Sequence, residues 1–211
     1  MHYYHIVKFD EGWGCGYRYG INEVPQIFKL QKYIEDSWSQ GFDPAGASHF
    51  DMNLKGSHKM IGAVDLLALL TYLGVQASLV ECRSSSDAMF DWIWQYFVDR
   101  QSYPTGSESD SSRDSEAFIS PIFFQFAWHC KIVIGIESTP KGKALLMLDP
   151  SEQPQITYLP NVALSIHSIR QTKEQCREYG KELQCLYIRS KAILTKEQSE
   201  SLKIPRASCR I

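Results

Sequence analysis

Apolar residues recur with helical spacing early in the chain. Between Val24 and Gln40 they fall on one face of a helix, at Ile27, Leu30, Ile34 and Trp38. Pro25 suits the first turn of a helix, where an N–H group has no partner, and Gly41 can end the helix in a left-handed conformation. The pattern therefore predicts a helix over Val24–Gln40 with one buried face.

Two more helices are predicted further along the chain. The stretch from Ile61 to Leu73 is apolar nearly all round, which is typical of a helix buried on every side, and Gly74 is its expected stop. Asp87 is placed to cap a third helix that runs to about Arg100 and carries many aromatic residues.

Strands are expected mainly in the second half. Apolar and β-branched runs bounded by turn residues mark five of them: Val75–Cys82, Ile122–Phe126, Cys130–Glu137, Lys143–Leu148 and Gln184–Arg189. The third and fourth are joined through Thr139–Gly142 as a hairpin. A polar helix is predicted over Ser165–Gly180, and Thr195 with Gln198 forms a capping box for a short last helix.

Early helices followed by an antiparallel sheet predict an α+β fold with helices packed on a central sheet. The chain has 211 residues and no internal repeats, so we expect a single domain over residues 1–211. The stretch 101–117 is rich in Ser, Asp, Glu and Gly. We expect a disordered surface loop there rather than an acidic binding motif.

Composition narrows the possible partners. The formal net charge of −2 offers no positive field for nucleic acid or an anionic membrane. No apolar run reaches the roughly 18 residues of a membrane-spanning helix, and the first residues lack the pattern of a secretory signal. We therefore expect no nucleic-acid or membrane partner, a monomer, and a place in the cytoplasm, the nucleus or both.

The six cysteines form no CxxC pair and no dense disulfide framework, which favours free thiols. His2 and His5 have no cysteine at ligand spacing nearby. We expect no metal site and no cofactor.

The stretch Gly12–Arg18 is the most unusual in the chain, because three glycines surround one cysteine, Cys15. Glycines allow a tight turn and the close approach of a substrate chain. A cysteine at the start of a helix has a lowered pKa, and the free N–H groups there can hold an oxyanion. The spacing fits both an activated nucleophile and a buried structural cysteine.

A cysteine nucleophile needs a base, and the base needs an orienting group. His129 immediately precedes the strand Cys130–Glu137, and Asp149 immediately follows the strand Lys143–Leu148. If Glu137 pairs with Lys143, Asp149 is the diagonal neighbour of His129 on the same face of the sheet. A register shifted by one residue would place the two on opposite faces.

Two further carboxylates draw attention. Asp65 is the only charged residue between Ile61 and Leu73, and a buried unpaired carboxylate is costly, so it should meet a cation or face a cleft. Asp43 precedes Pro44, a common combination in turns, so on the residues alone a turn role is favoured for it.

Several stretches together resemble a known peptidase family. Gly12–Arg18 (Gly-Trp-Gly-Cys-Gly-Tyr-Arg) resembles the active-site motif shared by proteases of the ubiquitin-fold modifier and by ZUFSP-type deubiquitinases. The other stretches are closer to the ZUFSP-type branch: Gly41–Ser48, Leu54–Gly56, Ile61–Ala63, Val133–Glu137 and Leu148–Pro150. The match runs from about Gly12 to Pro150.

This resemblance implies a papain-like cysteine peptidase that cleaves after the C-terminal glycine of ubiquitin or polyubiquitin. The implied triad is Cys15, His129 and Asp149, and acidic residues at Asp43 and Asp65 are implied to hold arginines of the ubiquitin tail.

Further site residues follow from the same comparison. Tyr3 stands where the related modifier proteases have an oxyanion donor, with Tyr4 or His5 as alternatives. Gln125 is a candidate contact to the substrate tail. Trp13 and Trp128 lie near Cys15 and His129 in sequence. They could form the walls of a narrow tunnel for the glycine tail or simply pack in the core, and the sequence favours neither role.

One departure from the family bears on activity. Only Tyr19 to Val24 separate Arg18 from Pro25, and six residues are too few for the long central helix of the family, since one turn takes about 3.6. Three alternatives therefore stand beside a deubiquitinase: a protease of the ubiquitin-fold modifier, a non-catalytic ubiquitin binder, and an amidase or acyltransferase with a small substrate.

Overall fold

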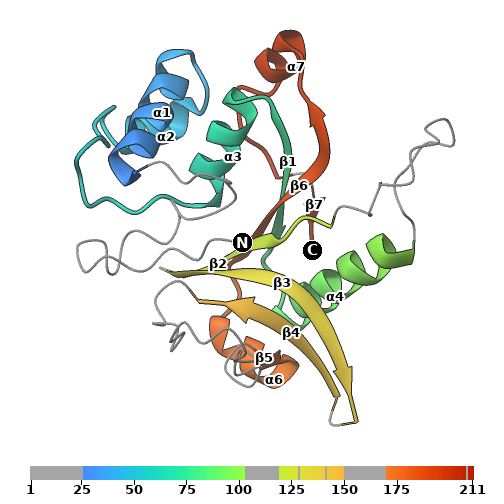
Figure 1. Cartoon of the computed structure of the whole chain (residues 1–211). Coiled ribbons are helices and arrows are strands. Elements are labelled where there is room, and N and C mark those ends of the chain that lie inside the picture. The colour runs from blue at the N-terminus through green and yellow to red at the C-terminus, as the bar shows by residue number, and fades with distance from the viewer. Residues whose placement is uncertain (1–25, 103–118, 128, 141, 150–169, 208) are drawn as a thin grey trace, which may run out of the picture.

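The structure, a computed structural model, describes residues 26–102, 119–127, 129–140, 142–149, 170–207 and 209–211. The described part is α+β, as predicted: helices pack on both faces of one twisted sheet (Figure 1). The seven strands run in the order β5-β4-β3-β2-β6-β1-β7, and every pair is antiparallel except β1 with β7.

The five predicted strands are present as β1, β2, β3, β4 and β6, with changes at the ends, whereas β5 and β7 were not predicted. Their bounds are β1 Val75–Cys82, β2 Ile122–Phe126, β3 His129–Thr139, β4 Gly142–Leu148, β5 Arg170–Thr172, β6 Leu183–Ile193 and β7 Cys209–Arg210. The helices are α1 Ile27–Ser39, α2 Pro44–His49, α3 Ala63–Tyr72, α4 Ser86–Ser102, α6 Lys173–Cys176, the 3-10 turn η2 Arg177–Tyr179, and α7 Lys196–Ser201.

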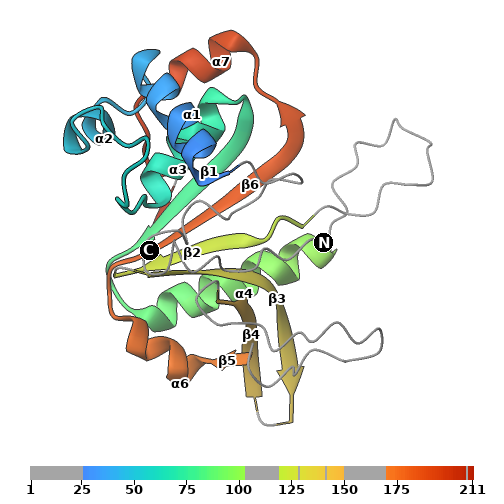
Figure 2. The same ribbon diagram turned by 60° about the vertical axis from the view of Figure 1, so that its left-hand side comes forward.

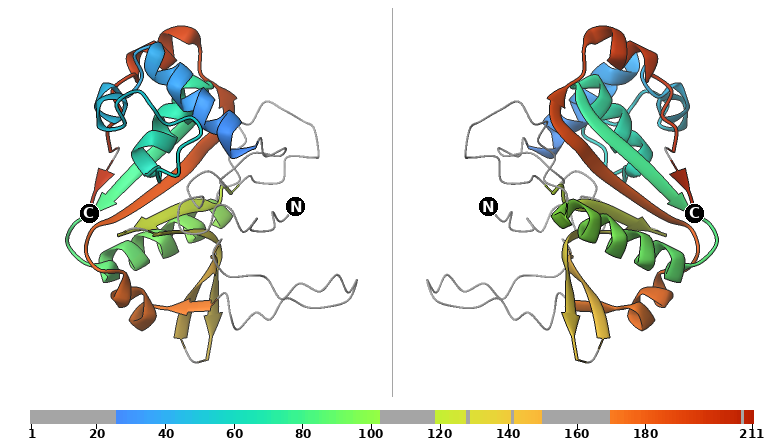
Figure 3. Two further views of the ribbon diagram at one scale, coloured as in Figure 1. Left: turned by 90° about the vertical axis from the view of Figure 1, so that its left-hand side faces the viewer. Right: turned by 90° about the vertical axis from the view of Figure 1, so that its right-hand side faces the viewer.

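The sheet separates two hydrophobic cores. Helices α1 to α3 cover one face over β1 and β6, whereas α4 and α6 lie against the other face (Figure 2). Side-chain alternation along the strands explains this division: Phe123 points into the α3 core, and its neighbours Ile122 and Phe124 point into the α4 core. The opposed views of Figure 3 show α4 running alongside β2 and β3.

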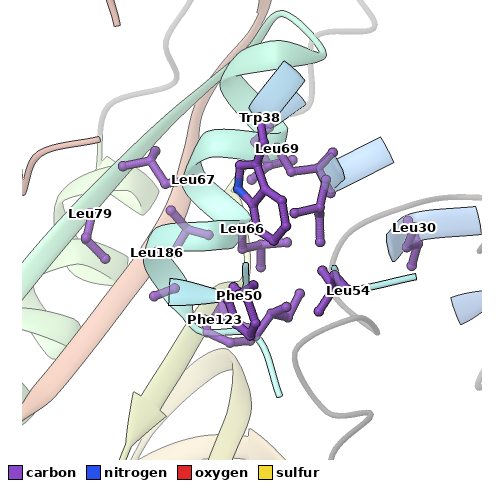
Figure 4. Packing of buried hydrophobic residues seen from close by; sticks show 14 of the residues in the cluster. Leu30, Trp38, Phe50, Leu54, Leu66, Leu67, Leu69, Leu79, Phe123 and Leu186 are labelled. Carbon is purple, nitrogen blue, oxygen red and sulfur yellow. The ribbon is translucent and has the colours of Figure 1, made fainter. Parts of the chain in front are cut away.

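Helix α3 is the buried helix that its sequence predicted. Its residues from Leu66 to Thr71 are all buried, and they pack against α1 and against Leu79, Phe123 and Leu186 of the sheet (Figure 4). The expected stop Gly74 has a φ of 78°, and Gly41 after α1 has a φ of 85°. Both glycines thus take a left-handed conformation, which was predicted for Gly41.

The predicted cap of α4 and the predicted start of the loop after it are wrong. Asp87 does not cap α4; the hydroxyl of Ser85 accepts the N–H of Ala88 at 3.1 Å, so Ser85 is the cap and Asp87 lies within the first turn. Helix α4 also runs through Ser102, so residues 101 and 102 of the expected loop are helical, and residues 103–118 lie outside the described part.

The single helix predicted over Ser165–Gly180 is also wrong. Residues 165–169 lie outside the described part; beyond them the chain forms the short strand β5, then α6 and η2. Arg170 explains the strand, because its side chain is bound by Glu137 of β3 while its backbone pairs with β4. Thr172 then caps α6 with Gln175 in a reciprocal capping box.

Candidate active site

His129 and Asp149 lie side by side at one edge of the β3–β4 hairpin. Nε2 of the imidazole is 2.8 Å from Oδ1 of the carboxylate. The His129 side chain is 30% exposed, whereas that of Asp149 is 10% exposed. The ring can therefore meet a substrate, while the carboxylate behind it is sheltered from water.

The hairpin register brings the two residues together in a different way from the one predicted. Near the turn, Glu137 pairs with Ala144 and not with Lys143, so the predicted pairing is wrong by one residue. A β-bulge between Val133 and Gly135 then removes the offset, and Ile132 lies opposite Leu148. The bulge restores the register in which the imidazole and the carboxylate share a face.

Aromatic residues support the imidazole from the α4 side of the sheet. Phe126 is the pairing partner of His129 across β2 and β3, and the two rings meet edge to face at 5.5 Å. Tyr179 of η2 packs on Phe126 with ring centroids 4.2 Å apart. The turn between the strands contains Ala127 with a φ of 44°, a conformation rarely adopted by alanine, which points to a tightly determined loop here.

Lys131 is a charged neighbour that the sequence reading missed. Its Nζ lies 3.4 Å from Oδ2 of Asp149, and its side chain is 12% exposed. The same ammonium lies over the ring of Tyr179, 5.4 Å from the centroid. The signal was available in the sequence, because residues two apart on a strand share a face, and Lys131 stands two positions after His129.

Asp43 is buried at the start of α2. It is 2% exposed and takes a left-handed conformation with a φ of 47°. Its Oδ1 accepts the N–H of Gly46 at 3.0 Å, so the turn role that the residues favoured is present. Its other oxygen, Oδ2, is buried and has no hydrogen-bond partner within the described residues.

Asp65 lies in the first turn of α3 and is 9% exposed. Its pKa is raised to about 6, mainly by burial. The hydrogen bond from the Gly62 N–H lowers the pKa, and the nearby charge of Asp43 raises it. The Gly62 N–H donates to Oδ2 of Asp65 at 2.8 Å. A buried carboxylate with a raised pKa marks a candidate binding site.

The two carboxylates converge beside Gly46. A Cβ placed on Gly46 would lie 2.1 Å from Oδ2 of Asp43 and 3.0 Å from Oδ1 of Asp65. Only a residue without a side chain allows both acids to occupy this space. The resulting pair of buried acceptors, which we call the carboxylate pair, is suited to a planar cation with several donors.

Gln125 connects the sheet to this region. Its Oε1 accepts the N–H of Ala63 at 2.6 Å, at the N-terminus of α3. The amide therefore fixes the end of the helix that carries Asp65. Its contact with a substrate tail stays a prediction.

The other predicted site residues, Cys15, Trp13 and Tyr3, lie outside the described residues, as does Trp128. Within the described ranges no group of three or more His, Cys, Asp or Glu side chains could hold a metal ion. The helices described there include none that is long and apolar enough to cross a membrane.

Comparison with known families gives a clear match. Peptidase family C78 matches residues 19–184 of this chain. The matched range contains His129, Asp149 and both acids of the carboxylate pair, and it begins four residues after Cys15.

Individual relatives agree with the family. The human protein named zinc finger-containing ubiquitin peptidase 1 is 33% identical over 174 residues, which cover 70% of this chain and 29% of that protein. Ubiquitin carboxyl-terminal hydrolase mug105 of Schizosaccharomyces pombe is 28% identical over 180 residues, 74% of this chain and 66% of that protein. The crystal structure of UfSP from C. elegans superposes with a TM-score of 0.47 at 14% identity, over 85% of this chain and 30% of that chain.

Proposed function

Because the chain belongs to peptidase family C78, a family of cysteine peptidases with a papain-like fold, we propose that it is a deubiquitinase that hydrolyses the bond after the C-terminal glycine of ubiquitin. The observation that carries the proposal is the imidazole–carboxylate pair of His129 and Asp149, 2.8 Å apart at the ends of two neighbouring strands. Such a pair is the orienting half of a cysteine peptidase triad.

The proposed reaction uses Cys15 as the nucleophile. With Nε2 of His129 held by Asp149, Nδ1 is the ring nitrogen that takes the thiol proton. The thiolate attacks the glycine carbonyl carbon, the C–N bond breaks, and the imidazolium donates its proton to the departing lysine amine. Water then attacks the thioester while His129 takes a proton from it, which releases the ubiquitin carboxylate and the thiolate.

The carboxylate pair supports ubiquitin as the substrate. Within the described residues neither acid forms an ion pair with a lysine or arginine, and their burial carries a desolvation cost. A bound guanidinium offsets this cost by donating hydrogen bonds to the carboxylate oxygens. The arginine-bearing tail of ubiquitin supplies such a group, and the tail of the ubiquitin-fold modifier fits the pair less well. The relatives named for ubiquitin are consistent with this substrate.

Other roles belong to the same proposal. The Cys15 backbone N–H and the Tyr3 hydroxyl stabilise the oxyanion, and Trp13 lines the passage for the glycine tail together with Gln125. We further propose that the protein works as a monomer in the cytoplasm, the nucleus or both, on ubiquitin or polyubiquitin chains. The chain spans about three tenths of the length of the human relative. These statements therefore concern this chain and not the human relative.

Ubiquitin carrying a C-terminal electrophile tests the proposal directly. We expect a covalent adduct with this chain that Cys15→Ala abolishes, and no adduct with the matching probe of the ubiquitin-fold modifier. Labelling by the second probe alone would identify a protease of that modifier. Binding without an adduct would identify a ubiquitin binder, and inertness to both probes would refute the assignment altogether.

Gly46→Ala tests the carboxylate pair. The new Cβ would displace the Asp43 side chain, so we expect kcat/KM for ubiquitin cleavage to fall about thirtyfold, because losing one partner of a buried charge pair costs ~2 kcal/mol or more. Gly135→Ala is the control, since its Cβ would meet only Leu146 at an ordinary 3.7 Å. Equal kinetics in both variants would argue against an arginine site beside Gly46.

A further inference from the structure

Lys131 makes a contact that the proposed triad does not use. Asp149 presents Oδ1 to His129 at 2.8 Å and Oδ2 to the Lys131 ammonium at 3.4 Å. The carboxylate is thus held from both sides, by the imidazole on one oxygen and by the lysine on the other. β3 supplies both partners, and Asp149 directly follows Leu148, which lies opposite Ile132, the neighbour of Lys131. The arrangement is therefore built into the hairpin.

Lys131 is not an ordinary surface lysine. Its side chain is 12% exposed, against 30% for Lys173, which forms an ion pair with the exposed Asp91. The ring of Tyr179 covers the ammonium, and Tyr179 is itself fixed by donating a hydrogen bond to Gln171 at 2.8 Å. An ion pair sheltered in this way has more effect than an exposed one, whose contribution is about 0–1 kcal/mol.

Among the described residues, Asp149 is the anion that the Lys131 ammonium contacts. Burial raises the pKa of Cys176 to about 12, and burial likewise raises the pKa of Tyr179, so both are neutral at physiological pH. Asp87, on α4, is exposed and is bound by Arg177 at 2.9 Å. Burial lowers the pKa of Lys131, but Tyr179 and Asp149 together outweigh it and hold the pKa above its usual value.

We propose that Lys131 is a positioning residue of the catalytic pair: by binding Oδ2 of Asp149, it keeps Oδ1 directed at Nε2 of His129. A carboxylate on a strand end can rotate about its side-chain bonds, and each rotation away from the ring breaks the hydrogen bond that orients the imidazole. Lys131 removes that freedom. Its catalytic meaning rests on the proposed function, whereas its effect on the hydrogen bond does not.

The first experiment needs no substrate. NMR of the Cys15→Ala protein with isotope-labelled histidine reports the Nε2–H of His129 as a strongly hydrogen-bonded proton, assigned by its loss in His129→Gln. We expect Lys131→Met to abolish or broaden this signal and Lys131→Arg to keep it, because arginine can still donate to Oδ2. Lys143→Met removes the same charge from an exposed position on the neighbouring strand and should leave the signal unchanged.

The second experiment measures turnover with the active chain. Lys131→Met should lower kcat about tenfold with KM within twofold of the parent, and Lys131→Arg should restore most of the rate. If the Met variant melts early, Lys131→Leu replaces it, since leucine likewise has no donor for Oδ2 of Asp149. A His129 signal and a kcat that both survive Lys131→Met or Lys131→Leu would overturn the proposal.

The two experiments separate this inference from the proposed function. Loss of the His129 signal in a chain that never cleaves ubiquitin would leave the positioning role standing and refute the deubiquitinase. Ubiquitin cleavage at the parental rate by the Lys131 variants would support the deubiquitinase and refute the positioning role.

Discussion

His129→Gln is expected to lower kcat/KM for ubiquitin cleavage by about a thousandfold, in the range that removal of a general acid–base or a triad member produces. Glutamine can accept or donate a hydrogen bond, but it cannot take the thiol proton or return one to the leaving amine. The loss should appear in kcat rather than KM, because the imidazole acts on the reacting atoms and not on the ubiquitin tail.

Folding should change little in this variant. Without the ring, Asp149 still has the Lys131 ammonium on Oδ2, so no buried charge is left unpaired by the substitution. Thermal melting should therefore stay within a few degrees of the parent. His58→Gln, in an exposed loop position, is the control and should cleave at the parental rate. A His129→Gln chain that cleaves normally would remove His129 from the mechanism.

The hydrophobic pattern was enough to predict most of the elements. β1 and β2 begin and end where the apolar runs do, and α3 is buried nearly all round as its sequence indicates. Periodicity succeeds here because burial on a sheet or in a core imposes it on the residues themselves. It failed for Ser165–Gly180, where polar residues serve an edge strand and a capped turn instead of one helix. Their conformation depends on Glu137, 33 residues before Arg170.

The proximity of His129 and Asp149 could be predicted from the sequence, since the two residues flank the ends of adjacent strands. The strand register that brings them together could not. The bulge at Val133–Gly135 offsets a hairpin pairing that starts one residue away from the predicted one, and no single residue type there marks a bulge. The predicted proximity of His129 and Asp149 is therefore correct although the predicted pair Glu137–Lys143 is not.

The carboxylate pair was harder to predict than the contact between His129 and Asp149. Asp43 caps α2 and Asp65 lies in the first turn of α3, and only the tertiary fold brings an oxygen of each close to the Cβ position of Gly46. The sequence marked Asp65 as costly to bury but could not say how close Asp43 comes. Residues from separate elements meet through tertiary contacts that periodicity does not encode.

That cost leads to the second large effect, a gain of stability at the expense of function. Asp65→Asn should stabilise the free protein by about 1–3 kcal/mol at pH 7, because holding the carboxyl pKa at about 6 instead of 3.8 costs the folded state up to ~3 kcal/mol when the acid is ionised. Asparagine keeps an oxygen for the Gly62 N–H and carries no charge. At about 2–4 °C per kcal/mol, the melting temperature should rise by several degrees.

The pH dependence of the unfolding free energy shows the direction of this effect. The folded state binds a proton at Asp65 more tightly than the unfolded state, so the stabilisation by this proton is complete below pH 3.8 and is lost as the pH rises through about 6. The advantage of Asp65→Asn over the parent should therefore be largest at pH 7 and should vanish near pH 4. Urea melts of both proteins at several pH values measure this difference. Asp91→Asn, at an exposed position, should show no such trend.

Ubiquitin cleavage should move in the opposite direction. The neutral amide cannot form the charged hydrogen bonds with a guanidinium, so kcat/KM at pH 7 should fall about thirtyfold or more even though the protein is more stable. This combination separates a binding role from a structural one, since a carboxylate kept for folding would lose both on substitution. An Asp65→Asn protein that is less stable and equally active would show that the acid serves α3 and not the substrate.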